Sequence, residues 1–220
     1  MDDTLITLTD PRSPVSEAYR TLRTNLEFFS LDEPIRTLVV TSPGAEEGKS
    51  TVLANLAVTL AQGGKRVILI DCDLRRPTQH ALFGLDNATG LTTMMLDEAA
   101  QADPPLRETS VDGLRVLPSG PPPPNPAELL GSRRMKDAVA ALLGQADMVL
   151  FDAPPVLVVT DALVLAVQTD GVLLVVKAGG TKREHVQQAK ERLERVNARI
   201  VGAVLNSAPT DQALHGYYEI

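Results

Sequence analysis

Short, almost continuously apolar segments alternate along this chain with segments of helical periodicity. The apolar segments are Thr37–Thr41, Arg66–Asp71, Leu114–Leu117, Asp147–Phe151, Gly171–Lys177 and Arg199–Asn206. Strands of a parallel sheet are buried on both faces, so their apolar residues run without interruption instead of alternating with polar ones. The pattern therefore predicts six strands in a mainly parallel sheet.

Helical periodicity fills most of the intervals. Four such segments follow apolar runs: Lys49–Ala61, Arg134–Leu143, Asp161–Val167 and Arg183–Val196. Strands that alternate with helices are typical of a doubly wound α/β domain, with helices on both faces of the sheet. No internal repeat or linker divides the chain, so we expect one domain over residues 1–220. The pattern leaves the strand order open.

An additional helix is predicted at the N-terminus, over Ser13–Phe29. Ser13 or Ser16 can cap it, and Pro14 suits a first turn. Its apolar face would consist of Ala18, Leu22, Leu26 and Phe29.

A second segment outside the alternation is proline-rich. Ser119–Pro126 (SGPPPPNP) cannot form regular structure, because proline lacks the amide donor and restricts the residue before it. We expect a rigid surface loop. A ligand for a groove-binding domain is the alternative.

Composition narrows the class of protein. The 220 residues are 44% hydrophobic but include only four Phe, three Tyr and no Trp, so the core is aliphatic. The single cysteine, Cys72, excludes a disulfide framework. The formal net charge of −7 disfavours nucleic-acid binding. The longest apolar stretch, Met148–Val159, is interrupted by Asp152 and two prolines, so we expect no membrane span.

The segment Thr41–Thr51 (TSPGAEEGKST) follows a predicted strand and precedes a predicted helix. It ends in the Gly-Lys-Ser of a P-loop, in which backbone N–H groups hold phosphates, the lysine reaches the β- and γ-phosphates and the hydroxyl binds Mg²⁺. Pro43 stands where the full pattern has its first glycine. We expect the loop to bind nucleotide through Gly44, Ala45, Glu46, Glu47, Gly48, Lys49, Ser50 and Thr51.

Three aspartates lie at or just beyond predicted strand ends. Asp71 ends the run VILID, and Asp73 follows two residues later. Two carboxylates so close repel each other unless a cation or a shared proton separates them, and Mg²⁺ at a phosphate is such a cation. Asp152 follows four apolar residues, as a Walker B aspartate does. No Asn-Lys-x-Asp run is present, which favours ATP over GTP.

Together these motifs resemble the bacterial tyrosine kinase family, the P-loop autokinases of capsule and exopolysaccharide synthesis. The resemblance extends from Ser13 to about Asn206. Besides the three Walker-type motifs it rests on the LRRP after Asp73, on DAPP from Asp152 with the later Thr160-Asp161, and on the Glu-x-x-Arg-x-x-Arg spacing of the family's oligomerisation motif. In this chain that motif consists of Glu17, Arg20 and Arg23.

The resemblance implies a protein-tyrosine kinase that uses ATP and Mg²⁺. Lys49 would stabilise charge on the phosphates. Ser50, Asp73 and Asp152 would organise the metal ion. Asp71 would accept or orient the tyrosine proton, although spacing allows the two neighbouring aspartates to exchange roles.

Three further residues have less definite roles. Arg75 and Arg76 would contact the phosphates or a neighbouring subunit, with surface salt bridges as the alternative. Asn206 ends the last predicted strand, where related P-loop proteins contact adenine.

The family implies autophosphorylation in trans of C-terminal tyrosines. The tail at 207–220 contains only Tyr217 and Tyr218, where family tails are commonly richer in tyrosine. They are the expected phosphoacceptors. We expect Tyr19, inside the N-terminal helix, to have a packing role.

Partners also follow from the resemblance. It implies a ring-like homo-oligomer, an octamer by family resemblance, assembled through the helix at 13–29. It further implies protein tyrosine substrates and a membrane-anchored polysaccharide co-polymerase or activator domain. We therefore expect a cytoplasmic protein at the inner face of the cell membrane, held there by a partner or by a membrane region missing from this chain.

Two alternatives share these motifs. A switch ATPase of the cell-division and partition type carries a signature lysine five residues before the P-loop lysine, and Gly44 occupies that position here. A nucleotide-dependent assembly scaffold of the polysaccharide export machinery, with little kinase activity, would have the same Walker motifs. The few tyrosines are its main support.

Overall fold

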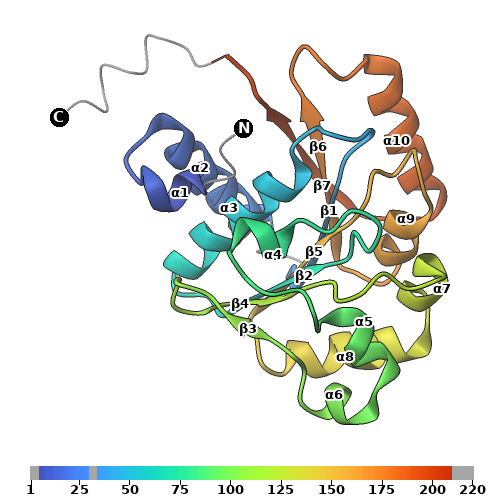
Figure 1. Cartoon of the computed structure of the whole chain (residues 1–220). Helices are drawn as coiled ribbons and strands as arrows, with labels where there is room; N and C mark the ends of the chain where they lie inside the picture. The colour runs from blue at the N-terminus through green and yellow to red at the C-terminus, as the bar shows by residue number, and fades with distance from the viewer. Residues whose placement is uncertain (1–4, 30–33, 210–220) are drawn as a thin grey trace.

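A mainly parallel sheet forms the centre of the molecule. The computed structural model describes residues 5–29 and 34–209 (Figure 1). Over these residues the strands are β1 (Thr37–Thr41), β2 (Val67–Asp71), β3 (Arg107–Glu108), β4 (Leu114–Leu117), β5 (Met148–Asp152), β6 (Gly171–Lys177) and β7 (Ile200–Asn206). Their order is β3-β4-β2-β5-β1-β6-β7, and every neighbouring pair is parallel except β3 and β4.

The strand prediction is confirmed, and all six expected strands are present within one residue of their expected bounds. All residues of β1, β2 and β5 are buried, as strands covered on both faces must be. The one missed strand, β3, has two residues, too few to form a pattern.

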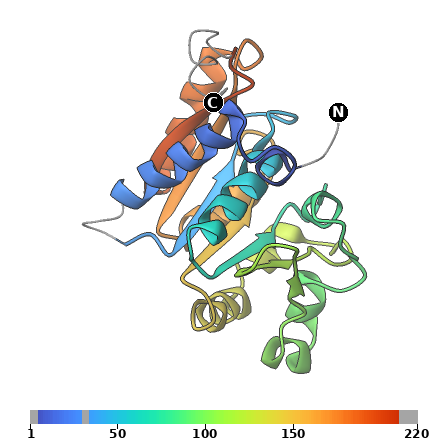
Figure 2. The same ribbon diagram turned by 90° about the vertical axis from the view of Figure 1, so that its left-hand side faces the viewer.

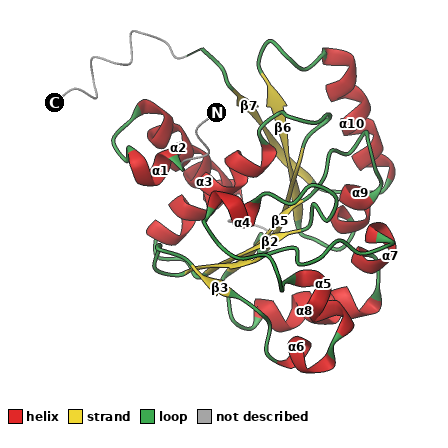
Figure 3. Cartoon of the chain, in the orientation of Figure 1, coloured by secondary structure: helices red, strands yellow, loops and turns green. Residues whose placement is uncertain are grey.

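Helices cover both faces of the sheet, which confirms the doubly wound class (Figure 3). One face is covered by α1 (Ile6–Thr9), α2 (Pro14–Phe29), α3 (Lys49–Gln62) and α4 (Gln79–Leu82). The other carries α5 (Leu91–Leu96), α6 (Glu98–Ala102), α7 (Pro126–Leu130), α8 (Arg133–Leu143), α9 (Asp161–Ala166) and α10 (Arg183–Arg195). Among the described residues, no helix is both long and apolar enough to cross a bilayer.

Successive residues of a strand belong to different cores. In β1, Val39 packs with the helices of one face, whereas Leu38 and Val40 pack with α3 and α2 on the other. Figure 2 shows α2 and α3 in front of the sheet from the side. Both cores are aliphatic, and Phe151 is the only fully buried aromatic residue within the described part of the chain.

The N-terminal helix begins as predicted, with Ser13 before Pro14 and the amide of Ser16 bonded to the Ser13 hydroxyl at 3.2 Å. Its predicted apolar face is partly wrong. Ala18 and Phe29 are exposed, and the face that packs on the core consists of Tyr19, Leu22 and Leu26. The ring of Tyr19 brings more apolar area to this contact than the methyl group of Ala18 would.

The proline-rich segment is only partly a surface loop. Ser119 and Gly120 are buried, and Pro126 is the first residue of α7, where its missing amide proton costs no hydrogen bond. Gly90 explains the burial. A Cβ at Gly90 would lie 2.1 Å from the carbonyl oxygen of Pro118, so only glycine lets the two backbones approach. Residues 121–125 are irregular and largely exposed.

Candidate active site

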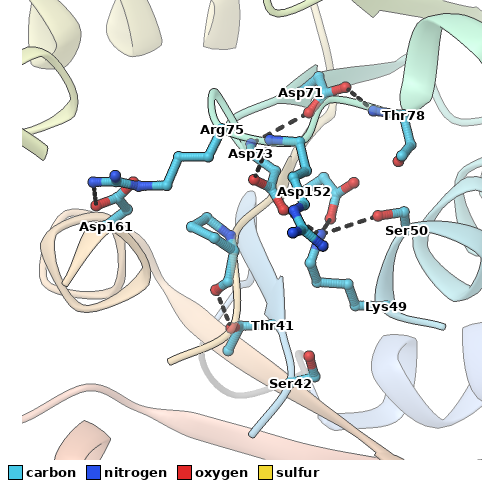
Figure 4. A network of polar contacts seen from close by, with 12 residues as sticks. Thr41, Ser42, Lys49, Ser50, Asp71, Asp73, Arg75, Thr78, Asp152 and Asp161 are labelled. Atoms are coloured by element: carbon cyan, nitrogen blue, oxygen red, sulfur yellow. Dashed lines mark hydrogen bonds and ion pairs between the residues drawn. The ribbon is translucent and has the colours of Figure 1, made fainter. Parts of the chain in front are cut away.

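Three neighbouring strands bring the predicted site residues to one edge of the sheet. Because β2, β5 and β1 are adjacent and parallel, their carboxyl ends coincide. Asp71 and Asp152 are register partners, and the loop after Thr41 begins beside them. This edge is where open α/β sheets bind ligands. Figure 4 shows the side chains that converge there.

The P-loop is held in shape by its own contacts and by the last strand. Glu46 and Gly48 have positive φ angles of 61° and 85°. A Cβ on Gly48 would lie 2.1 Å from the Asn206 amide nitrogen, which donates to the carbonyl oxygen of Glu47 at 2.9 Å. The amide of Gly44 donates to the Glu47 carboxylate at 3.0 Å. Such a loop before a helix N-terminus turns N–H groups toward an anion.

Lys49 is the centre of the charged network. Its ammonium lies 2.9 Å from Asp73 Oδ2, 3.0 Å from Asp152 Oδ1 and 3.1 Å from the hydroxyl of Ser50. Burial by itself would lower the pKa of Lys49, but the charges of Asp152 and Asp73 outweigh it and raise the pKa. Lys49 therefore remains charged at any physiological pH.

Asp71 lies beneath this network and is fully buried. Its carboxylate accepts bonds from the backbone amides of Asp73 at 3.2 Å, Thr78 at 2.9 Å and Gln79 at 2.9 Å. Burial, together with the charge of Asp152, raises the pKa of Asp71 to about 8. Because it accepts bonds from three backbone amides of the loop that follows β2, Asp71 fixes the course of that loop.

A cavity of about 280 Å³ opens over the network. Its lining includes the charged residues Lys49, Asp73 and Arg76 and the apolar residues Leu82 and Pro155. Asp71 does not line it. Of the eight loop residues predicted to bind nucleotide, six line it: Ala45, Glu46, Gly48, Lys49, Ser50 and Thr51. The other two, Gly44 and Glu47, bond to each other.

Two larger cavities lie elsewhere. One, of about 750 Å³, lies between α2 and β7 and includes Asn206 and Val52. Asn206 thus touches the P-loop on one side and this cavity on the other. The other, of about 550 Å³, lies at the opposite edge of the sheet near Arg36 and Asp170, away from all predicted site residues.

The two arginines after Asp73 have different environments. Arg75 forms a bidentate ion pair with Asp161, at 3.0 and 3.2 Å, and Asp161 is fully buried. Figure 4 shows Arg75 extending away from Lys49. The salt-bridge alternative therefore describes Arg75. Arg76 is exposed and lines the cavity, and its backbone amide donates to Asp73 at 3.0 Å.

Sequence reasoning missed Gln79. It is fully buried, and its amide nitrogen donates to Asp152 Oδ2 at 2.7 Å and to the carbonyl oxygen of Ser50 at 3.1 Å. It is the first residue of the four-residue helix α4, and no motif or periodicity marks it.

The remaining predicted residues lie outside this cluster. Glu17 and Arg20 form an ion pair at 2.7 Å on α2, partly exposed, and the Arg23 guanidinium donates to the carbonyl oxygen of Thr59 on α3 at 2.8 Å. Tyr217 and Tyr218 lie outside the described residues.

The oxygen-rich donor set suits Mg²⁺. Within residues 5–29 and 34–209, no three acidic, histidine or cysteine side chains form a group that could hold a metal ion by themselves. Mg²⁺ does not need such a cage, because it is usually held by one or two carboxylates and by substrate phosphates. Ser50, Asp73 and Asp152, all within 3.1 Å of Lys49, supply oxygens of that kind.

Comparisons with known proteins find a matching family model and similar sequences. The CobQ/CobB/MinD/ParA nucleotide binding domain matches residues 38–216. The tyrosine-protein kinase YwqD of Bacillus subtilis is 44% identical over 99% of this chain and 92% of its own length. The putative tyrosine-protein kinase CapB of Staphylococcus aureus is 38% identical over 94% of this chain and 91% of its own length.

Longer relatives and solved structures extend the comparison. The tyrosine-protein kinase Wzc of Salmonella typhi is 34% identical over 98% of this chain, which spans only 30% of Wzc. The crystal structure of the chimerical protein CapA2B2 superposes with a TM-score of 0.89 at 39% identity, covering 94% of this chain and 90% of that one. The kinase domain of Escherichia coli ETK gives 0.88 at 32% identity, covering 95% and 82%.

Proposed function

The chain belongs to the bacterial tyrosine-protein kinases built on the CobQ/CobB/MinD/ParA nucleotide binding domain, and we propose from this that it transfers the γ-phosphoryl group of Mg²⁺-bound ATP to tyrosine hydroxyls of its own C-terminal tail. The observation that supports this best is the position of Lys49. It lies between Asp73 and Asp152 at the mouth of the P-loop. We infer that the activity serves capsule or exopolysaccharide synthesis.

The nucleotide would span two cavities. Phosphates would lie against the N–H groups of the P-loop and the ammonium of Lys49. The adenine would lie near Asn206, because that side chain joins the P-loop to the larger cavity between α2 and β7.

The metal-binding oxygens would be those of Ser50, Asp152 and Asp73. Mg²⁺ bound there would neutralise charge on the phosphates during transfer. Phosphate oxygens would also attract Lys49, which the two carboxylates hold in place before ATP binds. Transfer depends mainly on positioning and charge, because phosphoryl transfer requires little covalent chemistry from the protein.

The acceptor tyrosine would enter this cavity and contact its apolar lining residues. Its ring would pack on Leu82 and Pro155, with its hydroxyl toward Asp73. The sequence left open which of the two aspartates faces the tyrosine proton, and the position of Asp73 supports giving it that role besides its share in the metal site. Asp73 lines the cavity, whereas Asp71 is buried beneath it and bonded to three backbone amides.

The acceptors would be Tyr217 and Tyr218, reached in trans. They follow the last described residue, Pro209, by eight and nine residues, and the chain has a single further tyrosine. That residue, Tyr19, packs on the core and is a poor acceptor. A neighbouring copy, held by the helix at 13–29, would present its tail at 207–220 to this site.

The helix α2 would also determine assembly and, through assembly, location. A ring of copies would form through Glu17 and Arg20, whose ion pair lies on the outer side of α2. A membrane-anchored activator would hold the ring at the inner face of the membrane. The same role could fall to a membrane region of a longer protein, since this chain spans only 30% of the relative Wzc.

The direct test is phosphopeptide mapping after incubation of the purified chain with Mg²⁺-ATP. We expect phosphate on Tyr217 and Tyr218, and loss of most of the signal when both are replaced by Phe. Tyr19→Phe is the matched control and should leave the signal nearly unchanged. An unchanged phosphotyrosine yield in the Tyr217→Phe, Tyr218→Phe double variant would refute the tail as substrate, and no phosphotyrosine in the wild type would favour the scaffold alternative.

A further inference from the structure

Gln79 connects all three nucleotide-binding motifs although it belongs to none of them. Its side-chain amide nitrogen donates to the Walker B carboxylate of Asp152 at 2.7 Å and to the P-loop carbonyl of Ser50 at 3.1 Å. Its backbone amide donates to Asp71 at 2.9 Å. Resting on the proposed function, we propose that Gln79 is a positioning residue of the kinase reaction, one that fixes the Asp152 carboxylate against the first turn of α3.

The two oxygens of Asp152 have different partners. Oδ1 accepts from Lys49 at 3.0 Å, and Oδ2 accepts from Gln79 at 2.7 Å. With both oxygens bonded in different directions, the carboxylate cannot rotate about its terminal bond. When phosphates attract Lys49, the bond from Gln79 remains and still holds Oδ2 in place. Outer hydrogen bonds of this type orient metal-binding carboxylates and tune their affinity.

Gln79 also relieves a charge conflict without adding charge. Asp71 and Asp152 are register partners on adjacent strands and both are fully buried. One residue supplies an N–H donor to each of them, through its backbone and through its side chain. A lysine at this position would provide a charge that competes with Lys49, and an aliphatic residue would leave Oδ2 of Asp152 without its donor.

The orientation of the Gln79 amide has a cost. Its nitrogen must face the carboxylate, so its oxygen faces the other way, and that buried oxygen has no hydrogen-bond partner within the described residues. Buried acceptors without a partner are rare and destabilising, which argues against a role in packing alone. The amide nitrogen is thus held toward Asp152 and Ser50 at the expense of the oxygen.

The test compares Gln79→Met with Gln168→Met. Gln168 is a matched control because its amide nitrogen also donates two bonds, to the carbonyl oxygens of Val164 at 2.7 Å and Leu130 at 3.2 Å, far from the P-loop. Gln79→Met should lower kcat roughly 10- to 100-fold, in the range seen for outer-shell partners of metal ligands, with KM for ATP changed much less. Gln168→Met should leave both unchanged.

A binding readout separates positioning from general loss of structure. Titration calorimetry with ADP alone should give the same affinity for wild type and Gln79→Met, because the P-loop binds the phosphates in both. The gain in ADP affinity on adding Mg²⁺ should be smaller in Gln79→Met. Gln79→Glu, which places an oxygen beside Asp152, should lose more of this gain.

The outcomes distinguish this inference from the proposed function. Wild-type kcat and a wild-type Mg²⁺-dependent gain in Gln79→Met would overturn the role of Gln79 and leave the kinase assignment intact. If Gln79→Met does not fold, Gln79→Asn replaces it, because asparagine keeps a polar amide but withdraws the donor by one methylene. Wild-type kcat and a wild-type Mg²⁺-dependent gain in Gln79→Asn would equally overturn the role of Gln79. A wild type without phosphotyrosine would refute the proposed function, while the calorimetry would still test Gln79.

Discussion

Lys49 and the carboxylates around it show how single residues create the chemistry of this site. Each of the charged groups is nearly or fully buried, and each is held by a specific partner. Buried ion pairs of this kind contribute little net stability compared with apolar packing, but removing one partner costs about 3–5 kcal/mol. The cluster is therefore better explained by phosphate and metal binding than by stability.

Tyr19 provides a residue-scale prediction about pH. Burial raises the pKa of Tyr19 to about 12. In the Tyr217→Phe, Tyr218→Phe double variant, Tyr19 is the only tyrosine, so the ultraviolet absorbance of the phenolate should titrate near pH 12 instead of near pH 10. The folded state binds this proton more tightly than the unfolded state does. The stabilisation is therefore complete below pH 10 and is lost as the pH rises toward 12.

A matched variant isolates this effect. Tyr19→Phe keeps the ring that packs on the core but has no ionisable group, so its stability should fall less between pH 10 and pH 12, as measured by urea unfolding. A midpoint near pH 10 in the double variant would show that Tyr19 is solvated, and the packing role would then be wrong.

At the scale of single elements, α2 depends on its first turn. The Ser13 hydroxyl accepts the amide of Ser16 at 3.2 Å, which satisfies one of the free N–H groups at the start of the helix. Ser13→Ala should therefore lower the free energy of unfolding by about 1 kcal/mol. Ser110→Ala, in an exposed loop, is the control and should change it by less than about 0.5 kcal/mol. Equal denaturation midpoints for the two variants would exclude a capping role.

The elements differ in how far the sequence predicted them. Long buried strands were found within a residue because parallel strands leave a continuous apolar signal. Short elements such as β3 and α4 (Gln79–Leu82) were missed, because two or four residues carry no period. The packed face of α2 was wrong because the alternative pattern through Ala18 fits helical spacing equally well, and only the contact with α3 decides between them.

The site residues also divide into those that the sequence predicted and those that it did not. Residues in motifs were brought together as the motifs implied, because adjacent parallel strands must place their ends at one edge. The roles of Asp71 and Asp73 depended on which of them lines the cavity, a property of the loop path that spacing does not specify. Gln79 reaches the site because the chain turns back after Pro77, and no local sequence pattern predicts such a turn.

At the scale of the whole molecule, the structure sharpens the test of assembly. Arg23 bonds internally to α3, so replacing it would disturb the fold as well as any contact between copies. Glu17 and Arg20 pair with each other on the surface, and an exposed pair contributes at most about 1 kcal/mol to stability. Glu17→Ala with Arg20→Ala is therefore the cleaner variant.

We expect this double variant to be a folded monomer where the wild type is a large oligomer, as measured by light scattering. Phosphorylation of its tail should also fall, because transfer in trans needs a neighbouring copy. The control is Arg133→Ala with Asp137→Ala, which removes another exposed pair on the opposite face. Equal molar masses for the wild type and the Glu17→Ala, Arg20→Ala variant would reject the role of these residues in assembly.

The central claim is that this P-loop edge transfers phosphate to tyrosine, and Lys49 tests it most directly. Lys49→Met removes the ammonium, and Lys49→Arg keeps the charge but changes its geometry, so the latter controls for loss of stability. After incubation with Mg²⁺-ATP, mass spectrometry should find phosphotyrosine in the wild type and in the surface control Lys190→Met. It should find at least about 100-fold less in Lys49→Met and Lys49→Arg. A loss of this size corresponds to about 2.7 kcal/mol of transition-state stabilisation. Undiminished phosphotyrosine in folded Lys49→Met would contradict the account.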